Sequence, residues 1–151
     1  MTLIVARDDP MKPELTALLH ASHALMQSLF PAESNHYLEV EALTAPDIRF
    51  FSARLNDTAI GCSALKLADG YGEVKSMFVD PAARGAGAGA ALLTAIEAAA
   101  RTDALSLLRL ETGSKLEAAH RLYARAGFAE RGPFGAYADD PNSLFMEKVL
   151  T

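Results

Sequence analysis

The spacing of apolar residues in the first third of the chain predicts helices. After Pro13, apolar residues recur every three or four positions up to Leu29, which is the period of one helix face. Proline suits the first turn of a helix, and Phe30 and Pro31 end the pattern. A polar break follows at residues 31–36, and residues 37–43 are predicted to form a second, shorter helix.

Runs rich in β-branched and aromatic residues, bounded by Asp, Asn, Gly and Pro, predict the strands of a sheet. The predicted strands are residues 2–7, 48–55, 59–67, 72–79, 105–111 and 143–149, with another that starts at Phe128. Two further helices are predicted at residues 91–100 and 114–126. The order β-α-α-β-β-β-α-β-α-β-β, with no repeat and no linker, predicts one mixed α+β domain over residues 1–151.

The composition limits the functions and the cellular locations that such a domain could have. Half of the 151 residues are hydrophobic and 22% are charged, with a net charge of −5 and no basic run, which argues against a nucleic-acid partner. No apolar segment reaches the length of a membrane span, and the N-terminus lacks the pattern of a signal peptide. Because Cys62 is the only cysteine and the histidines lack metal-ligand spacing, we expect a cytoplasmic protein without a disulfide or a metal site.

The stretch after the central predicted strand carries the strongest chemical signal. The strand ends at residues 80–81, Arg84 follows, and the alternating glycines Gly85, Gly87 and Gly89 precede a helix. The first amides of a helix lack intrahelical partners, glycine lets a ligand approach the backbone, and arginine adds a cation. The stretch therefore predicts a binding site for a phosphate or diphosphate group.

Other interpretations of this stretch compete with that one. It could be only a helix start rich in Gly and Ala, although alternating glycines weaken a helix start unless the bare backbone is needed. A P-loop does not fit, because no lysine follows Gly89. Gly85, Gly87 and Ala90 match the dinucleotide pattern G-x-G-x-x-G/A, with Glu111 about 20 residues further on. A small nicotinamide-binding oxidoreductase is therefore one alternative, although residues 80–84 separate the strand from the glycines.

Two motifs together resemble one enzyme family. The spacing R-x-x-G-x-G, formed by Arg84, Gly87 and Gly89, resembles the acyl-coenzyme A signature of the GNAT family of N-acetyltransferases. The motif A-x-x-L-Y-x-x-x-G-F, which starts at Ala119 and contains Tyr123, is similar to the family motif after the fifth strand. The segments PAESNH, GEVKSMFV, LETG and PFGAY resemble a bacterial branch of small acetyltransferases. The resemblance covers nearly the whole chain and implies the GNAT fold, a central, mostly antiparallel sheet flanked by helices.

The resemblance also implies a reaction and a cofactor site. The reaction transfers the acetyl group of acetyl-coenzyme A (acetyl-CoA) to a primary amine of a small molecule or peptide, by direct attack in a ternary complex. In this family the central strand diverges from its neighbour, and the pantetheine arm pairs with it. The residues that carry over as cofactor-binding are Met77, Phe78, Val79, Arg84, Gly85, Ala86, Gly87, Gly89 and Ala90. Leu116 stands where the family often has an Asn or Gln that contacts the cofactor, so that hydrogen bond is not expected here. Members of the family often form homodimers.

The catalytic candidates follow from the same resemblance. Tyr123 resembles the family's general acid, which protonates the departing sulfur, and Glu73 resembles the glutamate that accepts the amine proton, often through water. The alternatives are a tyrosine that only packs against the core and an exposed glutamate at a strand end. A non-catalytic coenzyme A sensor on the same fold would need neither residue, so it is a second hypothesis of another class.

The acceptor site has three candidates. Ser34 and His36 lie in the polar break that the resemblance places over the acceptor pocket, and Tyr137 lies in a Gly/Pro/Asp-rich loop as a wall of that pocket. The alternative for His36 is a solvated loop histidine. His20 and His23 are expected on the surface of the first helix.

Overall fold

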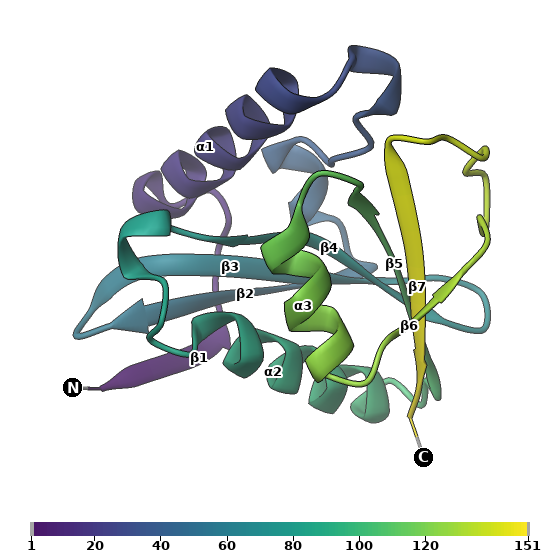
Figure 1. Cartoon of the computed structure of the whole chain (residues 1–151). Helices are drawn as coiled ribbons and strands as arrows, with labels where there is room; N and C mark the ends of the chain where they lie inside the picture. Colours follow the sequence, from purple (N-terminus) through teal and green to yellow (C-terminus); the bar gives the residue numbers. More distant parts are fainter. Residues whose placement is uncertain (1, 151) are drawn as a thin grey trace.

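The computed structural model describes residues 2–150, so both ends of the expected domain range 1–151 lie outside the described residues. One seven-stranded sheet runs through the molecule in the order β1-β2-β3-β4-β5-β7-β6 (Figure 1). The strands are β1 (Leu3–Arg7), β2 (Ile48–Leu55), β3 (Thr58–Leu67), β4 (Gly72–Val79), β5 (Leu107–Gly113), β6 (Ala129–Arg131) and β7 (Ser143–Val149). All neighbouring strands are antiparallel except β4 and β5, which confirms the expected mixed, mostly antiparallel sheet.

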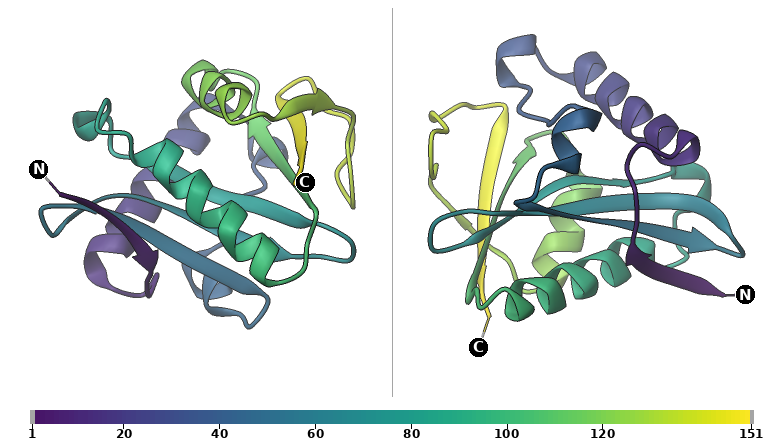
Figure 2. Two further views of the ribbon diagram at one scale, coloured as in Figure 1. Left: turned by 90° about the horizontal axis from the view of Figure 1, so that it is seen from below. Right: turned by 180° about the vertical axis from the view of Figure 1, so that it is seen from behind.

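Helices cover both faces of the sheet (Figure 2). Helix α1 (Pro13–Leu29) lies on one face, and α2 (Ala88–Thr102) and α3 (Glu117–Arg125) lie on the other. Three short 3₁₀ turns are η1 (Ala32–Ser34), η2 (Val40–Thr44) and η3 (Pro81–Ala83). Each face has its own hydrophobic core. The core under α1 includes Cys62, which is buried and free.

Strands β4 and β5 separate soon after they pair. Their register has only two pairs, Gly72 with Leu108 and Glu73 with Arg109. Beyond these pairs, the edge of β4 that faces β5 has no strand partner among the described residues. This divergence confirms the split that the family resemblance implied.

A bulge interrupts β4 within the unpaired stretch. The β3 register passes from Cys62 opposite Phe78 to Ala64 opposite Lys75, so β4 holds one extra residue there. Ser76 adopts a left-handed φ of 56°, which is unfavourable for a residue with a Cβ. Bulges change the direction of the strand that carries them, and this one lies in the part of β4 that diverges from β5.

Three predicted element boundaries are wrong, and two of the differences have an identifiable reason. The helix expected at residues 37–43 is only the 3₁₀ turn η2, because the Tyr37 side chain is held by α1 and a seven-residue helix has little stability of its own. The strand expected from Leu105 begins at Leu107. The Leu105 amide donates instead to the carbonyl of Ala100, at 2.8 Å, and so closes the end of α2. The helix expected from residue 114 begins at Glu117.

Candidate functional site

The turn between β4 and α2 has the backbone of an anion site. Gly85 and Gly87 have φ values of 93° and 84°, and Gly87 caps the N-terminus of α2. Both conformations are left-handed, and nothing lies within 4 Å of where a Cβ would stand on either residue. Successive amides in such a turn point into one concavity, which favours a negatively charged group.

Gly89 has a different structural reason. A Cβ on Gly89 would lie 2.8 Å from Cδ2 of Leu122 on α3, so the bare backbone lets α2 and α3 approach each other closely. The expectation that all three glycines serve ligand access is therefore incomplete. Gly85 and Gly87 shape the turn, and Gly89 is required by helix packing as well.

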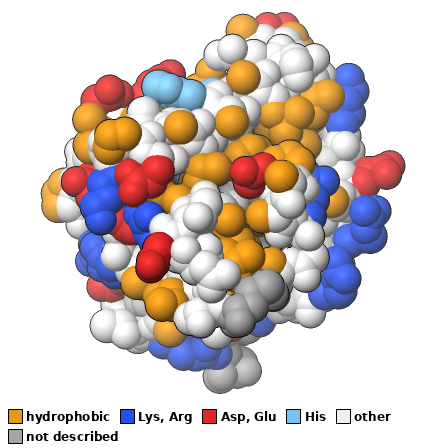
Figure 3. Space-filling view, turned by 90° about the vertical axis from the view of Figure 1, so that its left-hand side faces the viewer, with side chains coloured by type: hydrophobic (Ala, Val, Ile, Leu, Met, Phe, Trp, Pro, Cys, Tyr) orange, Lys and Arg blue, Asp and Glu red, His pale blue; other side chains and the backbone are white. Residues whose placement is uncertain are grey.

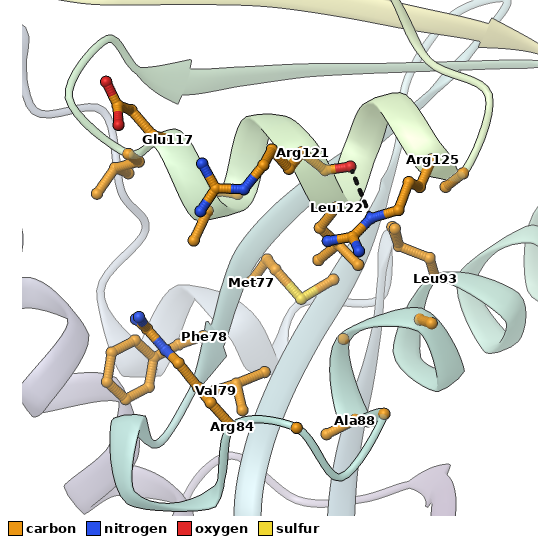
Figure 4. Close-up of a pocket in the computed structure, with 18 of the residues that line it drawn as sticks. Met77, Phe78, Val79, Arg84, Ala88, Leu93, Glu117, Arg121, Leu122 and Arg125 are labelled. Carbon is orange, nitrogen blue, oxygen red and sulfur yellow. Dashed lines mark hydrogen bonds between the residues drawn. The ribbon is translucent and has the colours of Figure 1, made fainter.

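A cleft of about 980 Å³ opens beside this turn (Figure 4). Its walls come from the unpaired end of β4, the turn, α2, α3 and the last turns of α1. Of the predicted cofactor residues, the cleft is lined by Met77, Phe78, Val79, Arg84, Gly85, Gly87, Gly89 and Ala90. Ala86 is not among the lining residues, whereas Leu116 is.

Sequence reasoning missed two cations in the wall of this cleft. Arg121 and Arg125 project from α3 on the side opposite Arg84 (Figure 4). Among residues 2–150, none of these three guanidinium groups forms an ion pair with a carboxylate. The spacing of four residues places Arg121 and Arg125 on one helix face, but the same pattern is typical of a solvated helix surface, so it could not single them out.

Tyr123 lies on the buried side of α3. It is 5% exposed and packs edge-on against Phe128. Its hydroxyl makes no hydrogen bond within the described part of the chain. Burial raises the pKa of Tyr123 well above its ordinary value, and the carboxylate of Glu111 raises it further, so the hydroxyl keeps its proton at neutral pH. A hydroxyl that keeps its proton and has no hydrogen-bond partner can donate that proton to a reacting group, as a general acid does.

A polar cluster occupies the opposite face of the sheet. Glu73, at the last position of β4 that pairs with β5, is 8% exposed and accepts a 2.5 Å hydrogen bond from the hydroxyl of Tyr137. Lys75 lies with its Nζ 3.5 Å from Glu73, and it donates to the Tyr137 hydroxyl at 3.0 Å and to the carbonyl of His36 at 2.9 Å. The structure thus brings together three of the predicted residues, Glu73, His36 and Tyr137.

Ser34 has a different set of partners. Its hydroxyl donates to Asp140 at 2.6 Å and accepts from the amide of Asn142 at 3.3 Å. These bonds tie residues 31–36 to the loop before β7. In this structure Ser34 therefore holds two loops together, and its one hydroxyl proton is already used in a hydrogen bond.

Glu111 is a site residue that the sequence pointed to only through the dinucleotide alternative. It lies on β5 and accepts a 2.7 Å hydrogen bond from Ser143. Burial raises its pKa above the usual value for a glutamate, and the charge of Glu73 acts in the same direction, while His36 and Lys75 oppose it. A buried carboxyl close to Glu73 is a second group that can exchange protons here.

His23 corrects another expectation. It was expected on the surface of α1 but is 7% exposed, and its ring stacks on Tyr37 with the centroids 3.9 Å apart. Its Nε2 is buried without a hydrogen-bond partner among residues 2–150. The helical period alone could not reveal this, because the segment that covers α1 comes from residues 31–44.

We expect His23 to make the stability of the fold depend on pH. Burial lowers the pKa of His23 below its ordinary value of 6.5; His20 acts in the same direction and Glu39 against it. Below pH 6.5 the histidine of the unfolded chain binds a proton, whereas the buried imidazole of the native state stays neutral. The free energy of unfolding should therefore fall as the pH drops from 7 to 5. Urea unfolding of the wild type and of His23→Phe, which keeps the stacked ring, measures this. Equal pH slopes for the two proteins would contradict the assignment.

Two classes of site find no support in the described residues. Across residues 2–150, no three side chains of His, Cys, Asp or Glu are grouped so that they could hold a metal ion. Within the same range, no helix has the length and apolar character needed to cross a membrane.

Comparison with known proteins places the fold and the cleft in one class. The pattern of the acetyltransferase (GNAT) family matches residues 15–128, and the chain belongs to that family. An IAA acetyltransferase from Azospirillum brasilense is 48% identical over 148 residues, which is 97% of this chain and 97% of that protein. The chain is therefore an acyltransferase of the N-acetyltransferase type.

Solved structures agree with this class. A crystal structure from Klebsiella pneumoniae, of a protein assigned to the acyl-CoA N-acyltransferases, is 35% identical, with a TM-score of 0.83 over 99% of this chain and 98% of that one. The PaiA N-acetyltransferase from Thermoplasma acidophilum, in complex with coenzyme A, has a TM-score of 0.75 at 16% identity and covers 99% of each chain, a likeness of fold alone. The dinucleotide alternative is wrong, because a Rossmann fold needs a mostly parallel sheet.

Proposed function

We propose that this chain, as a single N-acetyltransferase domain, transfers the acetyl group of acetyl-CoA directly to a primary amine of a small molecule or peptide within a ternary complex. The observation that carries the proposal is the continuity of the cleft. It joins a positively charged glycine turn to the unpaired edge of β4, at the point where the sheet is split. Acetyl-CoA fits such a cleft, because it combines a diphosphate, an extended amide-containing arm and a thioester that supplies the activated acetyl group.

The cofactor end of the site is assigned to the turn. The amides around Gly85 and Gly87 and the guanidinium of Arg84 bind the diphosphate. The open backbone of β4 at Met77, Phe78 and Val79 pairs with the pantetheine arm, as a strand edge pairs with any extended backbone. An amide of this edge can also polarise the acetyl carbonyl. Leu116 contributes an apolar contact where the family often has an amide side chain.

The proton-transfer groups lie on the two faces of the split. Tyr123, on the α3 side, donates a proton to the departing thiolate. Glu73, on the α1 side, accepts the proton of the attacking amine directly or through water, and Glu111 is a second carboxylate close by. The buried carboxylates also favour a cationic acceptor over an anionic one.

The acceptor side is bounded by His36 and Tyr137. Their rings meet edge-on with the centroids 5.1 Å apart, beside the Glu73 carboxylate. Because Tyr137 and Lys75 already contact Oε2 of Glu73, an incoming ammonium group has to share the carboxylate with them or displace one of them. Residues 31–44 and 132–142 are therefore the segments that set acceptor selectivity.

A thiol-release assay with acetyl-CoA tests the proposed function. Mono- and polyamines, aromatic amines, peptides with free α-amino groups and, because of the relative's name, IAA form the panel of acceptors. We expect turnover with at least one amine. With that amine, Glu73→Gln should lower kcat by about 10²-fold and move the rising limb of the pH–rate profile upward, because the amine must lose its proton to solvent.

Two results would contradict these assignments. If no amine is acetylated but IAA is, the acceptor is not an amine. If Glu73→Gln keeps the wild-type profile and Glu111→Gln shifts it, then Glu111 is the base. Thermal unfolding of both variants provides the control, because a lost fold would lower activity without any change of mechanism.

A further inference from the structure

Arginines without an ion pair are concentrated at one place in this molecule. Among the residues that the structure describes, four arginines have no carboxylate partner, and they are Arg7, Arg84, Arg121 and Arg125. Three of the four line the single cleft described above, in a chain with a net charge of −5. An acidic protein can pair most of its cations, so three unpaired guanidinium groups around one opening indicate an anionic ligand.

In the absence of a ligand, the two arginines on α3 destabilise the helix by charge repulsion. Arg121 and Arg125 are one helical turn apart, and like charges at that spacing destabilise a helix. Arg125 uses its Nε to donate to the carbonyl of Arg121 at 3.3 Å, which leaves the outer nitrogens of its guanidinium available. Glu117, one turn before Arg121, also lines the cleft but forms no ion pair with it in the described structure.

The position of the three groups separates them into two subsites. Arg84 belongs to the glycine turn, whereas Arg121 and Arg125 face that turn from the other wall (Figure 4). On the face shown in Figure 3, Lys and Arg side chains lie along the right-hand edge, which is the side turned toward the viewer in Figure 1, and others lie next to acidic side chains at the left.

We infer that Arg121 and Arg125 form a subsite for the 3′-phosphate of coenzyme A. The inference rests on the proposed function, because it assumes that the diphosphate of the same ligand lies on the turn. Coenzyme A carries its third phosphate as a monoester on the ribose, beyond the diphosphate. A phosphate monoester has a charge of about −1.5 to −2 at pH 7 and three acceptor oxygens, which match the planar donors of arginine. Occupation of this subsite also relieves the repulsion between the two arginines.

Calorimetric titration with coenzyme A and with 3′-dephospho-coenzyme A tests this subsite. The wild type should bind coenzyme A about 10- to 100-fold more tightly, which is the range for charge-assisted hydrogen bonds. The double variant Arg121→Gln/Arg125→Gln should bind the two ligands about equally, with its affinity for the dephospho form unchanged. Arg84→Gln should weaken both ligands by the same factor and keep their ratio. Arg7→Gln, which removes one positive charge at a residue that does not line the cleft, should change neither affinity.

Each other outcome has a definite meaning. If the wild type binds both ligands equally, or if the double variant weakens both by the same factor, the α3 arginines are not a 3′-phosphate subsite. If Arg7→Gln lowers the ratio as much as the double variant does, the effect is one of overall charge and the inference is wrong. If neither ligand binds the wild type, the proposed function itself fails, which is a distinct result. Thermal unfolding without ligand should show the double variant to be at least as stable as the wild type.

Discussion

Replacement of Tyr123 by phenylalanine is expected to lower kcat about 100-fold and to leave the affinity for acetyl-CoA unchanged. The ring fills the same space in the core between α3 and the sheet, so only the hydroxyl is lost. That hydroxyl has no hydrogen bond to give up within residues 2–150, so the fold should keep its stability. General acids typically raise the reaction rate by about 10²–10⁴-fold. The lower value applies because the thiol has a pKa of about 8.5, so its thiolate can leave without protonation.

The pH profile supplies an independent check on this acid. Because burial raises the pKa of Tyr123 above 10, wild-type turnover should not fall on the alkaline side until well beyond neutral pH. The measurement requires single-turnover conditions in which the chemical step limits the rate. If the phenylalanine variant then keeps full turnover, Tyr123 is a core residue only, and the proton comes from water or from Tyr137.

The second large effect is expected from Gly87→Val. A valine at a φ of 84° is strained, and relief of the strain would turn the amides of the turn away from the diphosphate. At 100 times the dissociation constant, acetyl-CoA should stabilise the wild type by about 2.7 kcal/mol, or about 5–10 °C in Tm for a domain of this size. The variant should lose that shift, with a Kd at least about 100-fold higher.

The chain offers a matched control for this substitution. Gly70 has nearly the same φ, 85°, and equally open surroundings, but it lies in the β3–β4 turn, which is not part of the cleft. Gly70→Val should therefore lower the Tm of the free protein by a similar amount, while the shift with acetyl-CoA persists. If both variants lose the shift, the loss comes from general destabilisation, and the turn has no special role.

Local pattern predicted the elements that have a strong period or clear end signals. Helix α1 and strand β7 have the bounds that were expected, because Pro13, the Phe30-Pro31 pair and the alternation after Ser143 mark them. Asn56 and Asp57 form the turn between β2 and β3, and both adopt the left-handed φ that a tight turn requires. The family motifs then supplied the split sheet, which no local period could indicate.

The parts that the sequence could not predict depend on contacts between distant segments. Tyr37 covers His23 from across a loop, so a face of α1 that looked solvated is buried. The charge of Glu73 acts on Glu111 only because β4 and β5 pair at Gly72 and Glu73, close to Glu111 along β5. Arg121 and Arg125 can be recognised as part of the cleft only when the position of α3 opposite the glycine turn is known. In each case the residue type was visible and its neighbours were not.

The split between β4 and β5 has a consequence for the free protein. An unpaired strand edge normally lies at the rim of a sheet, where proteins guard it against pairing with other chains. Here it lies in the middle, between α1 and α3, where only a slender extended molecule can reach it. An extended molecule in this position can form main-chain hydrogen bonds with the unpaired edge of β4. Amide hydrogens of β4 should then exchange with solvent faster than those of β3, and slow down when the cleft is filled. If acetyl-CoA pairs with β4 as proposed, the ligand completes the hydrogen-bond ladder of the sheet, and the rigidity of the centre of the sheet depends on the ligand concentration.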